Sequence, residues 1–175
     1  LKQIKQIENL INEFSDFARM PKPIFKDNNL NKVISENIEL ASKFDPNIQI
    51  KLINHTSKNI IMKFDYEQFS RLFFNLIKNS VESIQEKSSK VSKSNKNIDI
   101  EIRQRRDYII INIIDTGIGF QNKKTRDLIK PYFTTKEKGT GLGLSIVDKI
   151  VSDHNGSVNF LNHKNGAKIQ IIISK

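Results

Sequence analysis

Apolar residues recur with helical spacing in four segments of the chain, and each segment predicts a helix: residues 1–20, 30–44, 65–86 and 141–153. The third helix follows Asp65, a residue type that caps helix N-termini, and Gln68 stands three residues further on. This spacing predicts a capping box, in which the two side chains accept hydrogen bonds from each other's backbone N–H groups.

The first segment has apolar residues spaced alternately by three and four, as in helices that pair in a coiled coil or bundle: Ile4, Ile7, Ile11, Phe14 and Ala18. Pro21 and Pro23 predict the end of this helix, because proline cannot continue the helical hydrogen bonding. A helix of this length cannot bury the apolar seam alone. We therefore expect the end of a longer element that pairs with another helix.

Alternating or continuous apolar runs predict the strands: residues 48–53, 58–63, 98–103, 108–114, 157–161 and 167–173. We expect the first two to pair across a turn at 54–57, the next two to form a hairpin around 105–107, and the last two to be joined by a turn at 165–166. The order of helices and strands predicts an α+β sandwich, in which a mixed sheet is covered on one face by helices.

Composition adds limits rather than a function. The 175 residues carry a formal charge of +10 and include no cysteine, so a Cys-ligated metal site is excluded. No apolar run approaches the roughly 20 residues of a membrane-spanning helix. Most of the excess positive charge lies in two segments predicted as loops, 87–97 and 121–138. This allows a general affinity for polyanions but does not favour a specific nucleic-acid site.

Two asparagines stand on one face of the third predicted helix. Asn75 and Asn79 are four residues apart, next to the apolar stripe. Asparagine is a poor residue for a helix interior, so either the two amides simply face solvent or they have a function. The functional interpretation is that an amide oxygen binds a hard cation such as Mg²⁺.

Two glycine-containing turns complete the candidate chemistry. The strand predicted at 108–114 ends on Asp115, which is followed by Gly117 and Gly119. The carboxylate can accept a hydrogen bond from an amine, and the glycines let the backbone approach a flat ring. An ordinary turn after a strand is the alternative. Residues 139–143 carry three glycines before a predicted helix, an arrangement that can bind an anion. This turn matches neither a P-loop nor a Rossmann fingerprint.

The four motifs, taken in order, resemble those of the Bergerat (GHKL) ATPases, and within that superfamily the sensor histidine kinases. The N box corresponds to residues 75–79, the G1 box to 115–119, the F box to 131–136 and the G2 box to 139–144, within a match over residues 30–173. Residues 12–21 also resemble the end of the dimerisation helix in nitrogen-regulation-type sensor kinases. The resemblance implies a Bergerat-type sandwich with a mostly antiparallel sheet, preceded by a helix from a dimerisation bundle.

The resemblance also implies roles for individual residues. Asp115 would bind the adenine amine with Gly119 behind the ring, Asn79 would ligate Mg²⁺, Asn75 would lie near the phosphates, and residues 120–138 would form a mobile ATP lid. Lys136 and Lys138 are candidates for phosphate contact, or are solvated lid lysines. The implied nucleotide-binding set comprises Asn75, Asn79, Asp115, Gly117, Gly119, Phe133, Thr134, Thr135, Lys136, Gly139, Thr140, Gly141, Leu142, Gly143 and Leu144.

The chain's three histidines do not supply a phosphoacceptor. His154 fits a structural position after the last helix, and His55 and His163 lie in predicted turns. The resemblance places the phosphoacceptor histidine in an upstream helix, and residues 1–20 contain no histidine. We also assign no catalytic role to Glu82. We therefore expect no catalytic residue in this chain, which would comprise the C-terminal part of a dimerisation helix (1–22) and a catalytic domain (23–175).

The function implied by the resemblance is that of a protein-histidine kinase. The domain would bind ATP and Mg²⁺ and present the γ-phosphate to a histidine on its own dimerisation domain, for onward transfer to a response regulator. A homodimeric parent anchored in the inner membrane, with this domain in the cytoplasm, is expected. Two alternatives remain open from the sequence: a GHKL serine kinase that acts on a regulatory protein, and a nucleotide-gated interaction module.

Overall fold

The computed structural model describes residues 4, 11, 14–15, 17–56, 58–91, 95–120, 125–134, 136 and 139–175. Most of the helix predicted at 1–20 therefore lies outside the described residues, as do Thr135 and Lys138. Among the described residues, no helix is both long and apolar enough to cross a membrane.

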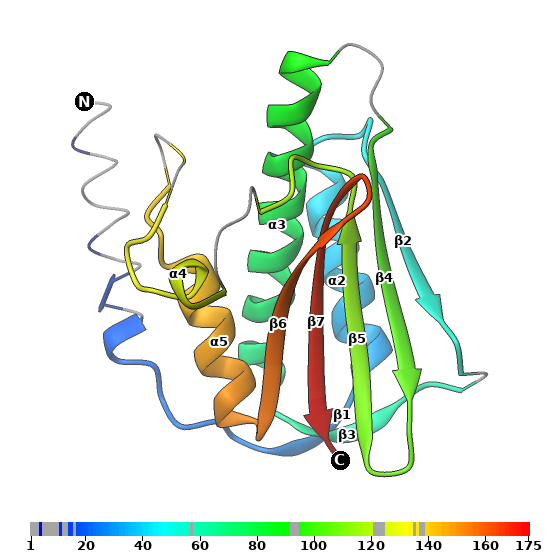
Figure 1. Cartoon of the computed structure of the whole chain (residues 1–175). Helices are drawn as coiled ribbons and strands as arrows, with labels where there is room; N and C mark the ends of the chain where they lie inside the picture. Colours follow the sequence, from blue (N-terminus) through cyan, green and yellow to red (C-terminus); the bar gives the residue numbers. More distant parts are fainter. Residues whose placement is uncertain are drawn as a thin grey trace.

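A five-stranded sheet forms one layer of the fold, and helices cover one of its faces (Figure 1). Its strands, in spatial order, are β2 (Gln49–Asn54), β4 (Asn97–Gln104), β5 (Tyr108–Asp115), β7 (Gly166–Ser174) and β6 (Gly156–His163). The β2–β4 pair is parallel and the other three pairs are antiparallel. The covering helices are α2 (Leu30–Ser42), α3 (Tyr66–Lys90) and α5 (Gly143–Asp153). The predicted α+β sandwich with a mostly antiparallel sheet is thus confirmed.

Alternating isoleucines of the three central strands face the helices. Alternate positions of β4, β5 and β7 carry isoleucines with at most 3% of their surface exposed, and these residues form one hydrophobic core with the apolar face of α3: Ile98, Ile100, Ile102, Ile109, Ile111, Ile113, Ile169, Ile171 and Ile173. Each such side chain contributes roughly 1.5–3 kcal/mol by leaving water. Their strict period of two fixes which face of each strand is buried, and hence the register of the sheet.

One predicted strand pairing is wrong. The segment predicted at 58–63 was expected to pair with 48–53, whereas β3 (Ile61–Phe64) pairs antiparallel with β1 (Lys26–Asn29) in a separate two-stranded sheet. Strand β2 instead runs parallel to β4. Alternation of apolar residues determines the buried face of a strand but leaves its partner open. The partner of β3 came from a segment that is too short and polar to be recognised as a strand.

Among the described residues, the other predicted elements form with shifted ends. The β4–β5 and β6–β7 hairpins form as predicted. Helix α3 continues to Lys90 rather than ending near residue 86. In this last turn Ser88 and Ser89 donate hydroxyl hydrogen bonds to carbonyls of the preceding turn, and Lys90 pairs with Glu86. A short helix, α4 (Thr125–Leu128), interrupts the segment predicted as a loop.

The start of α3 forms only half of the predicted capping box. Asp65 Oδ1 accepts a hydrogen bond from the Gln68 amide at 3.0 Å, as predicted. Gln68 does not reciprocate: its Nε2 donates to the Pro21 carbonyl at 2.9 Å, and its Oε1 accepts no hydrogen bond from the described residues. The Asp65 amide donates instead to Nε2 of His154 at 3.1 Å.

His154 ends helix α5 as a buried structural residue. Burial lowers the pKa of its ring, and the neutral ring donates from Nδ1 to the Ile150 carbonyl at 2.8 Å while Nε2 accepts from Asp65. Asp65 Oδ2 also accepts from the Ile24 amide at 2.7 Å. The segment after Pro21, the start of α3 and the end of α5 therefore meet at one cluster of hydrogen bonds.

Asp65→Ala removes the cap of α3 together with the hydrogen bond to Ile24. We expect the free energy of unfolding to fall by about 1–2 kcal/mol, the usual cost of losing an N-cap side chain, measured by urea denaturation. Asp27→Ala is the control, because Asp27 is exposed on β1. Equal losses in the two variants would contradict the structural role of Asp65.

Candidate functional site

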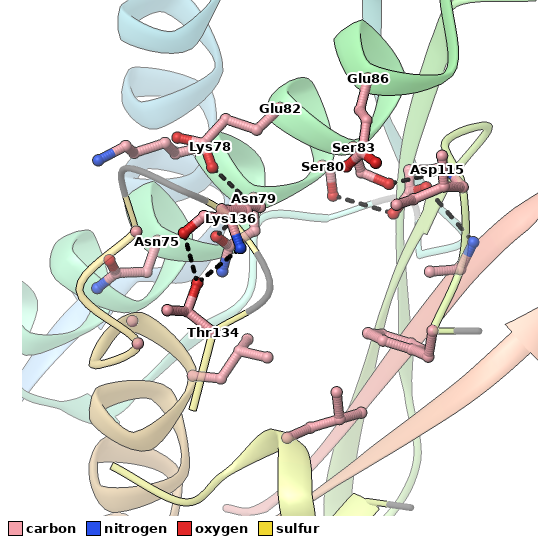
Figure 2. Close-up of a pocket in the computed structure, with 18 of the residues that line it drawn as sticks. Asn75, Lys78, Asn79, Ser80, Glu82, Ser83, Glu86, Asp115, Thr134 and Lys136 are labelled. Carbon is pink, nitrogen blue, oxygen red and sulfur yellow. Dashed lines mark hydrogen bonds and ion pairs between the residues drawn. The ribbon is translucent and has the colours of Figure 1, made fainter. Parts of the chain in front are cut away.

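A cavity of about 970 Å³ lies between α3, the turn that follows β5, and the segment leading into α5 (Figure 2). Residues from all four sequence motifs line it: Asn75, Asn79, Asp115, Gly119, Phe133, Thr134, Lys136, Gly139, Thr140, Gly141, Gly143 and Leu144. Of the other predicted residues, Gly117 lies just behind the wall, and Leu142 is fully buried in the core. Segments more than 60 residues apart in the chain are thus brought to one site.

Asp115 is buried because it continues the row of core isoleucines. It follows Ile109, Ile111 and Ile113 at the strand period of two, so its side chain points to the same covered face, and only 4% of the residue is exposed. An ionised carboxylate at such a position is costly unless hydrogen bonds compensate it.

Three donors hold the Asp115 carboxylate. Oδ1 accepts from the amides of Gly117 at 2.8 Å and Ala167 at 3.4 Å, and Oδ2 accepts from the Ser80 hydroxyl at 3.3 Å. Burial raises the pKa of Asp115, while these hydrogen bonds and the charge of Lys87 act in the opposite direction. The result is an oriented acceptor at the inner end of the cavity.

The turn after Asp115 requires glycine at position 117. A Cβ atom there would lie 2.1 Å from the Ser83 hydroxyl oxygen, so only glycine lets the turn approach α3 this closely. Ser83 Oγ in turn accepts a hydrogen bond from the Ile118 amide at 3.0 Å. The turn is therefore held against the helix that forms the opposite wall.

The other end of the cavity brings the two asparagines to the start of α5. Asn75 Nδ2 donates to the Arg71 carbonyl at 2.9 Å, and a Cβ on Gly143 would lie 3.4 Å from Asn75 Oδ1. The N-cap residue Leu142 makes no side-chain hydrogen bond to the helix. The N-terminus of α5 thus presents its positive end beside the amides, as anion sites do.

Gly141 shapes the turn before α5. Its φ of +72° is in the left-handed region, and a Cβ atom would lie 2.5 Å from the carbonyl carbon of Tyr132. The glycine turn and the predicted F box are therefore packed backbone to backbone, which holds Phe133 and Thr134 at the cavity wall.

Lys136 crosses the cavity to α3. Its ammonium group forms an ion pair with Glu82 and lies 3.4 Å from Asn79 Oδ1 (Figure 2). Glu82 had no predicted role, and the structure makes it the counterion of the lysine predicted to contact phosphate. The pair links Lys136, which lies within the predicted lid, to the helix that carries Asn79.

Several cavity residues were missed because the motifs do not include them. Ser80, Ser83 and Glu86 line the cavity from α3, and Ala167 and Ile169 line it from β7. A signal for the helical residues existed in the sequence. Ser83 and Glu86 continue the Asn75–Asn79 face at spacings of four and three, and Ser80 lies three residues before Ser83, which places all three on the same side of the helix.

Comparison with known proteins identifies the class. Residues 64–175 match the family described as Histidine kinase-, DNA gyrase B-, and HSP90-like ATPase, and the chain belongs to this family. The nitrogen regulation protein NtrY of Azorhizobium caulinodans is 32% identical over 158 residues, which are 90% of this chain and 20% of NtrY. The chain therefore spans about a fifth of the length of that relative.

Solved structures agree with this assignment. The catalytic domain of the histidine kinase ThkA superimposes with a TM-score of 0.74 at 25% identity, covering 87% of this chain and 96% of that one. A second structure of ThkA, in a complex, gives 0.80 at 21% identity over 99% of this chain and 48% of that one. Within the family, the chain is an ATPase catalytic domain of the sensor histidine kinase type.

The raised pKa of Asp115 predicts a pH dependence of stability. In the window between the ordinary aspartate pKa and the raised value, the folded protein binds more protons at this residue than the unfolded chain. The contribution of Asp115 to the free energy of unfolding therefore increases as the pH falls through the raised pKa, and decreases as it rises. Asp115→Asn removes this dependence and is expected to unfold at an equal or higher temperature than the wild type at neutral pH.

Thermal unfolding of both proteins across the acidic range measures this difference. The difference in unfolding temperature between the wild type and Asp115→Asn is expected to become smaller as the pH is lowered. Asp107→Asn, at an exposed residue in the β4–β5 turn, is the control and is expected to leave the pH profile unchanged. A wild-type profile that coincides with that of Asp115→Asn would contradict a raised pKa.

Proposed function

We propose that the domain binds Mg·ATP in the cavity and presents the γ-phosphate to a histidine on a dimerisation domain outside this chain. The observation that carries the proposal is the polarity of the cavity. A buried carboxylate acceptor lies at one end, and two amides, a lysine and a helix N-terminus lie at the other. This matches a ligand with an amine on a flat ring at one end and an anion at the other.

Adenine is proposed to occupy the end formed by Asp115. Its exocyclic amine donates to the carboxylate, and the ring lies against the backbone at Gly119. The phosphates lie toward the N-terminus of α5, with the glycines of residues 139–143 supplying backbone N–H groups. Lys136 exchanges Glu82 for a phosphate oxygen as the ligand enters.

Asn79 is proposed to ligate Mg²⁺. Its Oδ1 faces the cavity, where it lies 3.4 Å from the Lys136 ammonium group, so the position already attracts a cation. Among the described residues no group of three or more Asp, Glu or His could hold a metal ion. The residues present therefore fit an ion shared with phosphate oxygens and water, as Mg²⁺ usually is. When bound, the ion neutralises phosphate charge during transfer.

The proposal extends to partners outside the chain. Residues 1–22 are proposed to be the end of a dimerisation helix of a homodimeric parent, and Phe17 and Met20 pack against the catalytic core. In the second of the two ThkA structures, that kinase is in complex with the response regulator protein TrrA. By analogy, the phosphate is proposed to pass from histidine to a response regulator, with this domain in the cytoplasm and the parent anchored in the inner membrane.

Asn79→Ala tests the cation site. In Mg²⁺, ATP affinity measured by calorimetry is expected to fall at least about tenfold, since charge-assisted contacts contribute about 1.5–3 kcal/mol. In EDTA the wild type and the variant are expected to bind ATP equally weakly. The control is Asn159→Ala, at an exposed residue on β6. An equal loss with and without Mg²⁺ would show that Asn79 acts on the nucleotide or the fold and not on the ion.

Phosphotransfer is tested by supplying the acceptor. The chain incubated alone with labelled ATP and Mg²⁺ is expected to remain unlabelled. The full-length parent is expected to label itself. The phosphate on the labelled residue is expected to be lost in acid and kept in base, which is the behaviour of phosphohistidine. An acid-stable phosphate would favour the serine-kinase alternative. A parent that binds ATP without labelling would favour the nucleotide-gated module.

A further inference from the structure

Lys87 joins two turns at one end of the sheet. It lies in the last turns of α3, and its Nζ donates to the Thr116 carbonyl at 2.9 Å and to the Asn165 carbonyl at 2.6 Å. Thr116 belongs to the turn after β5 and Asn165 to the turn between β6 and β7, and both turns lie near the C-terminal half of α3 (Figure 1). No sequence motif includes this lysine.

The two turns are the ones that surround Asp115. The turn after β5 supplies the Gly117 amide to the carboxylate, and the start of β7 supplies the Ala167 amide. They also pack directly on each other, because a Cβ atom on Gly166 would lie 2.1 Å from the Asp115 carbonyl oxygen. A displacement of either turn would therefore move a donor away from the carboxylate.

Other side chains fasten only one turn each. Ser83 accepts from the Ile118 amide at 3.0 Å, and Asn162 Oδ1 accepts from the Phe120 amide at 2.9 Å. Asn162 lies at the end of β6 and so also joins the turn after β5 to the β6–β7 hairpin. Lys87 alone among the three is bonded through its side chain to the backbone of both turns, and it also brings a positive charge. That charge lowers the pKa of Asp115 and so partly offsets the effect of burial.

We propose that Lys87 is a positioning residue for the base of the nucleotide: it holds the turn after Asp115 against the β6–β7 turn and thereby fixes the carboxylate that receives the adenine amine. Lys87 does not line the cavity, so it acts through the turns rather than by touching the ligand. The inference rests on the proposed function, because it requires adenine at the Asp115 end. Two charge-assisted hydrogen bonds, from the Lys87 ammonium group in the last turns of α3 to the carbonyls of the two turns, are the physical basis of the clamp.

Lys87→Met in the 175-residue chain tests the proposal, with affinities for Mg·ADP and for adenosine measured by NMR titration. We expect both affinities to fall by the same factor, about tenfold, since the loss concerns the base. Lys87→Arg, which keeps the charge and several donors, is expected to recover most of the affinity. Lys90→Met is the matched control, because Lys90 is one turn further along α3 and pairs only with Glu86 among the described residues; wild-type affinity is expected.

Amide hydrogen exchange provides a readout that general destabilisation would not reproduce. In Lys87→Met the Gly117 and Ile118 amides are expected to exchange at least about tenfold faster, while amides in the β4–β5 ladder keep their wild-type rates. If Lys87→Met does not fold, the same comparison is made with Lys87→Gln, which keeps an uncharged N–H donor group and is expected to show a smaller effect in the same direction.

The outcomes separate the possible errors. A loss for Mg·ADP without a loss for adenosine would overturn the proposal in favour of a phosphate contact. Wild-type affinity for both ligands, or uniformly faster exchange throughout the sheet, would also overturn it. If the wild-type chain bound neither ligand, the proposed function would fail. This result differs from a failure of the Lys87 proposal because it is measured on the wild type and does not depend on Lys87.

Discussion

The structure depends on a carboxylate kept inside the apolar layer between sheet and helix. Asp115 occupies the position in β5 where the pattern of Ile109, Ile111 and Ile113 would place a fourth apolar residue. Its charge is tolerated because the surrounding segments supply donors, from Ser80 on α3 to the start of β7. Those donors in turn require turns that pack closely on α3 and on each other, which explains the glycine at 117 and the neighbouring Gly166.

Helix α3 links the two ends of the cavity. Its buried stripe packs on the sheet, and the polar face beside that stripe carries Asn75, Asn79 and Glu82 toward the start of α5. The cap at Asp65 ties the start of α3 to the end of α5 through His154. Relative movement of the two helices would change the distance between the amides and the helix N-terminus, so this cluster helps to keep the anion end of the cavity in place.

Much of the fold could be predicted from local patterns, and many of the residues that line the cavity could be predicted from the order of four motifs. The isoleucine alternation of β4, β5 and β7 and the apolar stripe of α3 are strong local signals and were confirmed. The pairing of β1 with β3 could not be predicted, since Lys26–Asn29 has no apolar alternation and its partner is chosen by tertiary packing. The contacts of Lys87 could not be predicted either. Its two carbonyl partners lie 29 and 78 residues away, so only the folded chain brings them to the lysine.

The central claim is that Asp115 selects a ligand with an amine donor. Comparing the affinities of ADP and inosine diphosphate in the presence of Mg²⁺ tests it most directly, because the two differ at the purine 6-position, where a carbonyl replaces the amine. A buried carboxylate that faces a carbonyl oxygen loses its hydrogen bond and is repelled. We predict that inosine diphosphate binds at least about 100-fold more weakly than ADP. Equal affinities for the two nucleotides would contradict the account.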